Sequence, residues 1–295
     1  MRTKPGVLGL AYKVVKFPRW NDENKYVLRF LACFCAMLVE LIWENGMVWL
    51  CSATDLHKHE RMEPLQDNVE IGMNMLGKQS AFIHWLNHLR WANILHFLGA
   101  ILALAFSVVW DQMPYSGFGL FARVVLTICF SRIIRVAAFM CTILPNPKPG
   151  CYMRRFPPLP PSTWEIIKAG YTTIRGFGGC NDLIISGHGA FWTLAPLALQ
   201  TYYQKYRWVG AFLWAALAHT SLRDVIDKQH YSVDMLLAVV VTYAVWNALD
   251  WVYPASQPLP ARPPGSPPDK PHPLVLALIA VALTAAGIIV IGGNC

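Results

Sequence analysis

Apolar residues in this chain gather into long uninterrupted stretches instead of alternating with polar ones. A helix needs about 20 apolar residues, with few charges among them, to cross roughly 30 Å of bilayer hydrocarbon. Windows of this kind cover residues 26–51, 93–110, 119–142, 188–203, 208–226, 232–251 and 274–291. The pattern predicts an all-α, polytopic membrane helical bundle with six core transmembrane helices and a seventh, C-terminal one.

The same pattern divides the chain into four segments. Residues 1–25 form a basic N-terminal segment without the short apolar run of a cleavable signal, so the first span is expected to direct insertion. Residues 26–253 form the six-helix domain. Residues 254–273 are so rich in proline that an extended linker is expected, and residues 274–295 form a C-terminal hydrophobic segment.

The distribution of basic residues predicts an orientation. The N-terminal flank carries Arg2, Lys4, Lys13, Lys16, Arg19 and Lys25, and basic flanks favour the cytosol. Counting spans then places loops 52–92 and 143–187, together with the junction between the fifth and sixth spans, on the far side. Loop 203–207 and the linker return to the cytosol. Basic residues in the far-side loops oppose this assignment without reversing it.

Composition supports a lipid environment, since 55% of the residues are hydrophobic and only 14% are charged. The net charge of +8 is spread over the loops, so we expect anionic lipid head groups as partners and no nucleic acid. The eight cysteines show no metal-ligand spacing. Cys151 and Cys180 fall in one far-side loop, where an oxidising lumen would allow a disulfide.

Loop 143–187 contains one predicted surface helix. The proline run at 145–149 should end the third span and continue as an extended segment. Further on, Ser162 and Glu165 fit a capping box at the start of a helix over 162–174. Within this helix, Trp164, Ile167 and Tyr171 form an apolar stripe that could lie in the membrane interface.

The first chemically informative segment is Ser186-Gly187-His188, at the mouth of the fourth span. Free backbone N–H groups in the first turn of a helix bind anions, and here they would stand beside a titratable ring at head-group depth. This arrangement predicts a phosphate site. The alternative is a hydrogen-bonded interfacial histidine without catalytic function.

The second segment contains His230 and Asp234, which share a helix face at the start of the sixth span. A carboxylate that bonds one ring nitrogen leaves the other free to attack phosphorus, and His188 could then protonate the departing alkoxide. We therefore expect the three side chains to converge within roughly 10 Å. A purely structural His/Asp pair and an incomplete set of metal ligands are the alternatives.

Further ionisable residues lie in or near the spans. Glu40 and Glu44 face one direction in the first span. They could line a pocket for a cationic head group, bounded also by Asp182 and open laterally beside His230, or they could pair with Arg132 or Arg135 inside the bundle. Arg135 could hold the substrate phosphate or only snorkel to the interface.

These motifs resemble a known superfamily. Ser186-Gly187-His188 with His230 and Asp234 is similar to the motif pair of PAP2-type lipid phosphatases and phosphotransferases. More closely, the two motifs resemble the signatures of sphingomyelin synthases and other phosphosphingolipid synthases, over about residues 135–251. The residues that carry this closer resemblance are Cys180, Asn181, Asp182, Ser186, Gly187 and His188, then His230, Tyr231, Ser232 and Asp234, with Arg135, Thr142, Leu144, Pro145 and Pro147 upstream.

The resemblance implies a reaction. A phosphocholine- or phosphoethanolamine-type head group would pass from a glycerophospholipid to ceramide through a phosphohistidine, without metal or cofactor. It implies His230 as nucleophile, Asp234 as its partner and His188 as acid. Substrate binding is assigned to Asp182, Ser186, Gly187, Arg135, Tyr231, Glu40 and Glu44.

The implied partners are a phospholipid donor, a ceramide or diacylglycerol acceptor and the bilayer, with homo-oligomer formation left open. The implied location is the lumenal or exoplasmic face of the Golgi, another endomembrane or the plasma membrane. Phosphatidylcholine:diacylglycerol cholinephosphotransfer, lipid phosphate hydrolysis and a catalytically inactive lipid-binding protein are the alternatives. Intact His188, His230 and Asp234 argue against the inactive protein.

The chain departs from the family pattern at three positions. Asn181 stands where the family usually has glycine, and Gly189 stands where it often has threonine. Asp224 occupies the position at which related phosphatases carry an arginine ahead of the second histidine. This last departure favours a transferase over a phosphatase.

Overall fold

The structure, a computed structural model, describes residues 20–57, 63–89, 115–151, 162–173, 180–202 and 207–252. Its helices in chain order are α2 (Trp20–Thr54), α3 (Asn68–Gln79), α4 (Ala81–His88), α6 (Gly117–Cys141), α8 (Thr163–Thr172), α9 (Gly187–Tyr202), α10 (Arg207–Ile226) and α11 (Ser232–Val252). These described ranges contain no strand, so the predicted all-α class is confirmed for them.

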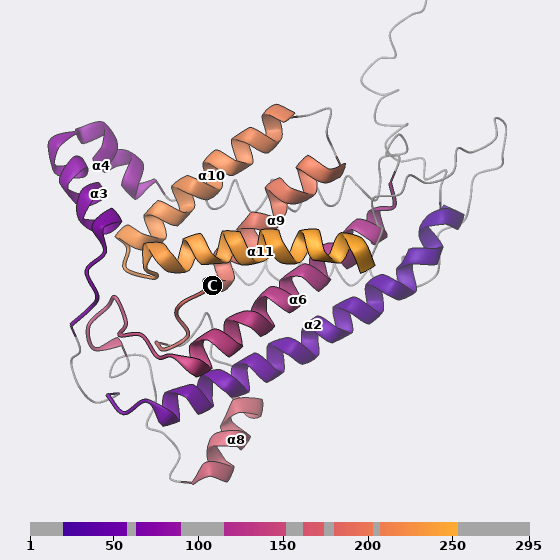
Figure 1. The fold of residues 1–295 in the computed structure, drawn as a ribbon, viewed down its shortest axis with the longest axis horizontal. Helices are drawn as coiled ribbons and strands as arrows, with labels where there is room; N and C mark the ends of the chain where they lie inside the picture. The colour runs from indigo at the N-terminus through magenta and orange to yellow at the C-terminus, as the bar shows by residue number, and fades with distance from the viewer. Residues whose placement is uncertain are drawn as a thin grey trace, which may run out of the picture.

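The long helices form a bundle (Figure 1). Helix α2 packs along α6, and α9 contacts α6, α10 and α11. The C-terminal ends of α2, α6 and α10 and the N-terminal ends of α9 and α11 all lie toward the left in Figure 1. We call this the motif end of the bundle. Span counting predicted that these termini share one side of the membrane, and the fold agrees with it.

Three described helices are long and apolar enough to cross a membrane, over Glu23–Thr54, Gly117–Cys141 and Ser232–Asp250. They correspond to the first, third and sixth predicted spans. The fourth and fifth predicted spans are helices α9 and α10, of 16 and 20 residues, which do not meet the same length and hydropathy conditions. The described residues therefore form a helical protein with three candidate membrane spans, and six spans stay a prediction.

Several sequence expectations fall outside the described residues. These are the basic flank before residue 20, the second span at 93–110, the proline-rich linker at 254–273 and the C-terminal span at 274–291.

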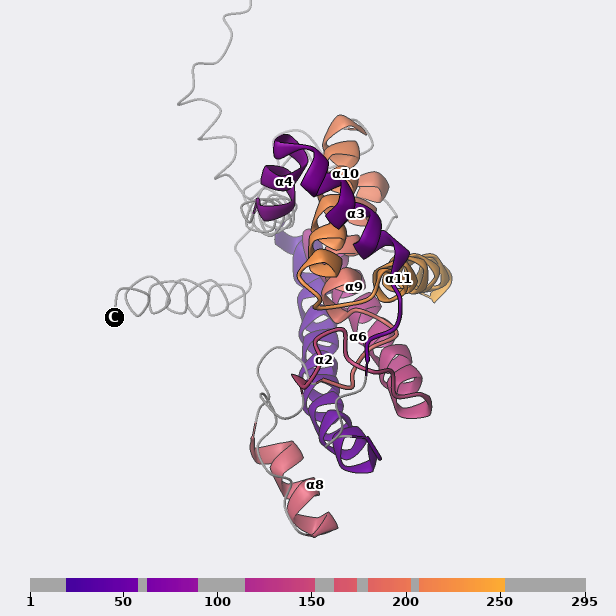
Figure 2. The same cartoon turned by 90° about the vertical axis from the view of Figure 1, so that its left-hand side faces the viewer.

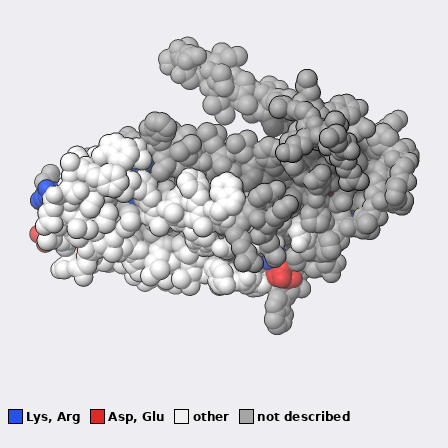
Figure 3. Space-filling view, turned by 90° about the horizontal axis from the view of Figure 1, so that it is seen from above, with Lys and Arg blue, Asp and Glu red and all other residues white. Residues whose placement is uncertain are grey.

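The core lies where α6, α9 and α11 meet. It consists of Leu120, Val124, Ile128, Ala190, Leu194, Leu197, Ala198, Tyr202 and Trp246. Other large apolar side chains point outward, among them Val39 and Ile42 on α2, Ile134 on α6 and Leu236 and Val240 on α11. In Figure 3 most of the described surface is uncharged, and Lys, Arg, Asp and Glu show mainly at its left edge and beside the grey region. An apolar band between charged ends is the surface that a bilayer requires.

Helix α8 is the predicted surface helix. The Ser162 hydroxyl accepts a hydrogen bond from the Glu165 backbone N–H at 3.3 Å, so the predicted cap is confirmed. Helix α8 packs against the C-terminal part of α2 (Figure 2). Trp164, Ile167 and Tyr171 of its stripe are exposed, and the Tyr171 ring also lies beside Gly46 of α2.

Within loop 52–92, for which no helix was predicted between the two spans, the structure contains α3 and α4. Asp67 caps α3 by accepting from the backbone N–H groups of Val69 at 2.9 Å and Glu70 at 3.2 Å. Ser80 ends α3 and caps α4 through the Ile83 N–H. A search for apolar windows long enough to span a membrane does not detect short helices such as these, which begin at polar caps and contain polar residues.

Cys151 and Cys180 form a disulfide, as the shared far-side loop allowed. The bond joins the segment after α6 to the segment before α9. Both residues are buried in an apolar cluster with Val48, Cys51 and Phe139. The disulfide thus lies against the ends of α2 and α6 at the motif end.

Candidate active site

Ser186 sets the start of α9 and thereby the position of His188. Its fully buried hydroxyl accepts a hydrogen bond from the Gly189 backbone N–H at 3.0 Å, as an N-cap residue does. His188 therefore stands in the first helical turn, where it is exposed. The first motif thus presents an imidazole in the first turn of a helix, at the positive end of the helix dipole.

Asp234 joins the two motifs. Its carboxylate is completely buried and accepts from the Ile184 N–H and the Tyr231 N–H, each at 3.0 Å. Its own backbone carbonyl accepts from the Ser186 N–H at 3.2 Å. One carboxylate oxygen lies 3.4 Å from Nδ1 of His230, an ion-pair contact slightly longer than a hydrogen bond.

The predicted convergence of the two histidines is confirmed. The ring centroids of His188 and His230 lie 6.4 Å apart, with the rings inclined at 60°. The His230 side chain is 12% exposed. Because Nδ1 of His230 faces Asp234, Nε2 is the nitrogen available to attack a phosphorus atom. This is the division of roles that an activated nucleophile requires.

Arg135 holds the segment that leads into α9. Its guanidinium donates to the backbone carbonyls of Ile185 at 2.8 Å and Asp182 at 3.0 Å. It also pairs with the carboxylates of Asp182 and Glu44. Between these anchors Ile184 adopts φ of 82°, a region that β-branched residues avoid. Strained backbone persists only where its surroundings over-determine it, and Arg135 together with Asp234 does so here.

Glu40 and Glu44 are paired inside the bundle. Arg132 contacts Glu40 at 3.1 Å and also pairs with Glu44, which in turn pairs with Arg135. Of the two arrangements that the sequence left open, the structure contains the ion-paired one. Contact of Glu40, Glu44 or Arg135 with a substrate stays a prediction.

The remaining predicted binding residues lie against the same cluster. A side chain at Gly187 would meet the Arg135 guanidinium at 3.6 Å, so the two residues are neighbours. Tyr231 is 5% exposed, and its hydroxyl donates to the Pro145 carbonyl at 2.8 Å and accepts from the Leu65 N–H at 2.9 Å. In this structure Tyr231 therefore connects three segments of the chain.

Asn181 and Gly189, the two departures from the family pattern within the first motif, each make a specific contact in the structure. The Asn181 amide donates to the Asp55 carboxylate at 2.6 Å and so joins the motif to the end of α2. A Cβ atom on Gly189 would lie 2.9 Å from the Cβ of Ala238, closer than real contacts allow. Glycine at 189 thus permits the close approach of α9 to α11.

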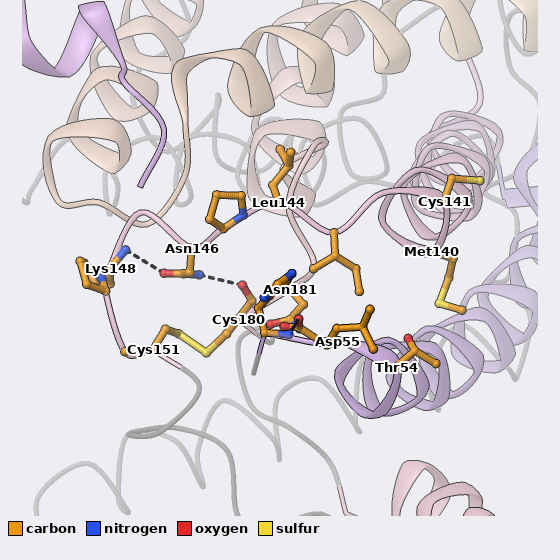
Figure 4. A pocket seen from close by; sticks show the side chains of 16 residues that line it. Thr54, Asp55, Met140, Cys141, Leu144, Asn146, Lys148, Cys151, Cys180 and Asn181 are labelled. Carbon is orange, nitrogen blue, oxygen red and sulfur yellow. Dashed lines mark hydrogen bonds between the residues drawn. A yellow bond between two sulfur atoms is a disulfide. The ribbon is translucent and has the colours of Figure 1, made fainter. Parts of the chain in front are cut away.

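A cavity of about 340 Å³ opens beside this region (Figure 4). It is lined by the ends of α2 and α6, the loop after α6 and the disulfide, and its polar side chains include Asp55, Asn146 and Asn181. It does not include Glu40, Glu44 or His230 among its lining residues. The lateral pocket predicted beside His230 stays a prediction.

Asp67 was missed at the sequence level. Besides capping α3, its second carboxylate oxygen accepts from the Ser232 backbone N–H at 2.6 Å, next to the second motif. The pair Asp67 and Glu70 has the spacing of a capping box, which would have located the start of α3. No local pattern could have revealed the contact with Ser232, which lies 165 residues away.

Comparison with known proteins agrees with this site. The family described as PAP2 superfamily C-terminal matches residues 179–252, which include His188, His230 and Asp234. The Protein PHLOEM UNLOADING MODULATOR of Arabidopsis thaliana is 24% identical over 85% of this chain and 73% of its own length.

Two enzymes are similar over a shorter range. Phosphatidylinositol:ceramide inositolphosphotransferase 2 of Arabidopsis thaliana is 30% identical over 44% of this chain, and the corresponding enzyme of Oryza sativa subsp. indica is 32% identical over 40% of it. The alignments span 43% and 37% of these enzymes. The resemblance read from the motifs is confirmed: residues 179–252 are a PAP2 superfamily C-terminal domain, homologous to plant inositolphosphotransferases of the sphingolipid synthase type.

Proposed function

We propose that this membrane protein transfers a phospho-head group from a glycerophospholipid to ceramide through a phosphohistidine on His230. The observation that carries the proposal is the meeting of His188 and His230, 6.4 Å apart, with Asp234 behind Nδ1 of His230. Two imidazoles at this separation fit on opposite sides of one phosphorus atom.

The reaction proceeds in two displacements. Nε2 of His230 attacks the donor phosphorus, and the bond from phosphorus to the diacylglycerol oxygen breaks as His188 gives that oxygen a proton. The neutral His188 then accepts the proton of the ceramide primary hydroxyl, whose oxygen attacks phosphorus. The bond between phosphorus and His230 breaks, and both histidines return to their starting states.

We propose inositol phosphate as the head group to test first. Phosphatidylinositol and ceramide stand in the names of the homologous enzymes. A pocket for a cationic head group would need carboxylates that carry no other partner, whereas Glu44 and Asp182 are paired with Arg135. Phosphocholine and phosphoethanolamine, the groups inferred from the motifs, are the alternative donors.

The proposal is tested in liposomes that contain purified protein, ceramide and phosphatidylinositol labelled in the head group. Wild-type protein should form labelled inositol phosphoceramide, and His230→Ala should form none. His88→Asn is a matched control, because His88 lies on α4 and contacts His84 of the same helix. Release of labelled inositol phosphate without a ceramide product would replace the transferase by a hydrolase.

The same assay distinguishes the two head-group hypotheses. If Glu44 and Asp182 only hold Arg135, then Glu44→Gln and Asp182→Asn should slow transfer from inositol, choline and ethanolamine donors alike. If these carboxylates bind a cationic head group, the two substitutions should change the preference among donors. The ratio of products from an equimolar donor mixture decides between them.

We also propose that the motif end faces an oxidising lumen, in the Golgi or another endomembrane. The disulfide between Cys151 and Cys180 lies beside Asn181 at that end, and disulfides persist in oxidising compartments.

A further inference from the structure

Residues 63–67 lie directly before α3, and they contact the second motif at two points. The Leu65 N–H donates to the Tyr231 hydroxyl at 2.9 Å. The Asp67 carboxylate accepts from the Ser232 N–H at 2.6 Å. We call residues 63–67 the strap. A third contact follows within α3, where Glu70 lies 3.2 Å from Lys228.

These contacts restrain the turn that carries His230. From the bundle interior, Asp234 accepts from the Tyr231 N–H at 3.0 Å. From the outer side, Asp67 accepts from the next backbone N–H, that of Ser232. The two consecutive peptide groups that follow His230 are thus each bonded to a different buried carboxylate. Removing either acceptor would leave a helix N-terminal N–H group without its partner.

Asp67 divides its two oxygens between two tasks. Oδ1 caps α3 by accepting from Val69 and Glu70, whereas Oδ2 accepts from Ser232. Burial by itself would raise the pKa of this carboxyl, but the hydrogen bonds from Ser232, Glu70 and Val69 hold it below its usual range. The carboxylate is therefore in its accepting form at neutral pH.

We propose that Asp67 is a positioning residue that fixes residues 230–232 from the outer side and so holds His230 toward the donor phosphorus. The inference rests on the proposed function for its catalytic part, and on the hydrogen bonds of the strap for its structural part. A reacting nitrogen must stand within a few tenths of an ångström of its productive position, and a displacement of about 1 Å can cost roughly 100-fold in rate.

Asparagine at position 67 separates the two tasks of the aspartate. An Asn side chain keeps one oxygen and is an equally good helix cap, so α3 should remain. Its NH2 group cannot accept from Ser232. Asp67→Asn should therefore lower kcat by roughly 10- to 100-fold while the KM for the donor lipid changes by less than about threefold. Glu63→Gln is the matched control, because Glu63 is an exposed carboxylate on the same strap.

Ser232→Pro removes both the N–H and the hydroxyl of Ser232, and so tests whether Asp67 acts through residue 232. Ser232 is the first residue of α11, a position where proline is tolerated because the missing N–H lies outside the helical hydrogen bonds. In the Ser232→Pro background, Asp67→Asn should have little further effect on kcat. Additive effects of the two substitutions would contradict the proposed connection.

Amide hydrogen exchange of the full-length protein in nanodiscs supplies a readout that needs no activity. Asp67→Asn should speed exchange in peptides that cover residues 228–233 and leave α3 peptides unchanged. Unchanged exchange there would overturn the inference, as would faster exchange with wild-type kcat. If wild-type protein transfers no head group to any acceptor, the proposed function fails, and the exchange data still decide whether Asp67 anchors the turn.

Discussion

The carboxylates around the histidines have partners of two kinds. Asp234 accepts from two backbone N–H groups and faces His230, whereas Glu44 and Asp182 are paired with the Arg135 guanidinium. A buried charge needs such partners, because an unpaired one costs several kcal/mol or more. In the proposed reaction the first carboxylate orients His230, and the other two hold the arginine that anchors the segment before α9.

Asp234→Asn tests this assignment at the level of one residue. The substitution keeps the size of the side chain but removes the negative charge that favours a charged imidazole, and it replaces one acceptor oxygen. We expect a folded protein whose single-turnover transfer rate falls by a factor on the order of 10³ to 10⁴. Rapid-quench measurement of diacylglycerol release reports the rate.

Asp227→Asn provides the control for that experiment. Asp227 lies in the connection just before α11, the helix that carries Asp234, and its carboxylate lies 3.6 Å from Arg223. It should transfer at close to the wild-type rate. A normal rate in Asp234→Asn would remove Asp234 from the mechanism and leave it a purely structural role.

Helices at the motif end approach one another through glycines. The Cβ position of Gly170 on α8 lies 2.9 Å from the backbone of Gly46 on α2, and that of Gly189 on α9 lies 2.9 Å from Ala238 on α11. Small residues let helix backbones come close, as in many membrane bundles. Helix α8 is further attached by Asn45, whose amide donates to the Gly170 and Thr173 carbonyls.

Gly170→Ala should weaken the attachment of α8 to α2. A methyl group at this crossing meets backbone atoms, which cannot move aside as a side chain can, so we expect a loss of roughly 1–3 kcal/mol in stability. The midpoint of thermal unfolding of the purified protein should fall. Gly72→Ala is the matched control, because nothing lies within 4 Å of its Cβ position on α3.

In the control, alanine replaces glycine inside an exposed helix and should stabilise the protein by up to about 1 kcal/mol. Equal shifts for Gly170→Ala and Gly72→Ala would mean that α8 does not depend on its crossing with α2.

The described part of the molecule combines an outward-facing apolar surface with one end, at the left in Figure 1, where the N-termini of α9 and α11 lie near the disulfide. Apolar side chains on α2, α6 and α11 face outward, and the histidines stand at the mouths of α9 and α11. A lipid substrate could thus keep its acyl chains in the bilayer while its phosphate reaches the site.

Reduction of the Cys151–Cys180 disulfide should destabilise the whole protein. The bond closes a loop with a sequence separation of 29 residues, for which loss of unfolded-chain entropy predicts a contribution on the order of 3–4 kcal/mol. Cys151→Ser with Cys180→Ser should lower the unfolding midpoint and the transfer rate. Cys35→Ser is the control, because Cys35 is an exposed free thiol on α2.

Sidedness is measured on the same cysteines. In sealed microsomes, a membrane-impermeant maleimide should label Cys151 and Cys180 only after both reduction and permeabilisation. Labelling of these residues in intact vesicles after reduction alone, without permeabilisation, would place the motif end in the cytosol and contradict the proposed orientation.

Local sequence patterns determined the helices and the motifs of this protein. Apolar windows predicted α2, α6 and α11, the proline run predicted the end of α6, and Ser162 with Glu165 predicted the start of α8. Span counting also placed His188 and His230 on one side of the membrane. These features depend on contacts between residues near in sequence or on the thickness of the bilayer, so the sequence is sufficient for them.

Only the tertiary structure decided which partners the polar residues take. Glu44 could have faced a substrate or an arginine, and Asp67 appeared to be an ordinary loop residue until the strap placed it against Ser232. The pairings join residues that lie 91 and 165 positions apart in the chain. The spacing of apolar residues along a helix does not indicate such contacts. The geometry of the packed bundle, and not the order of residues in one helix, brings the two partners together.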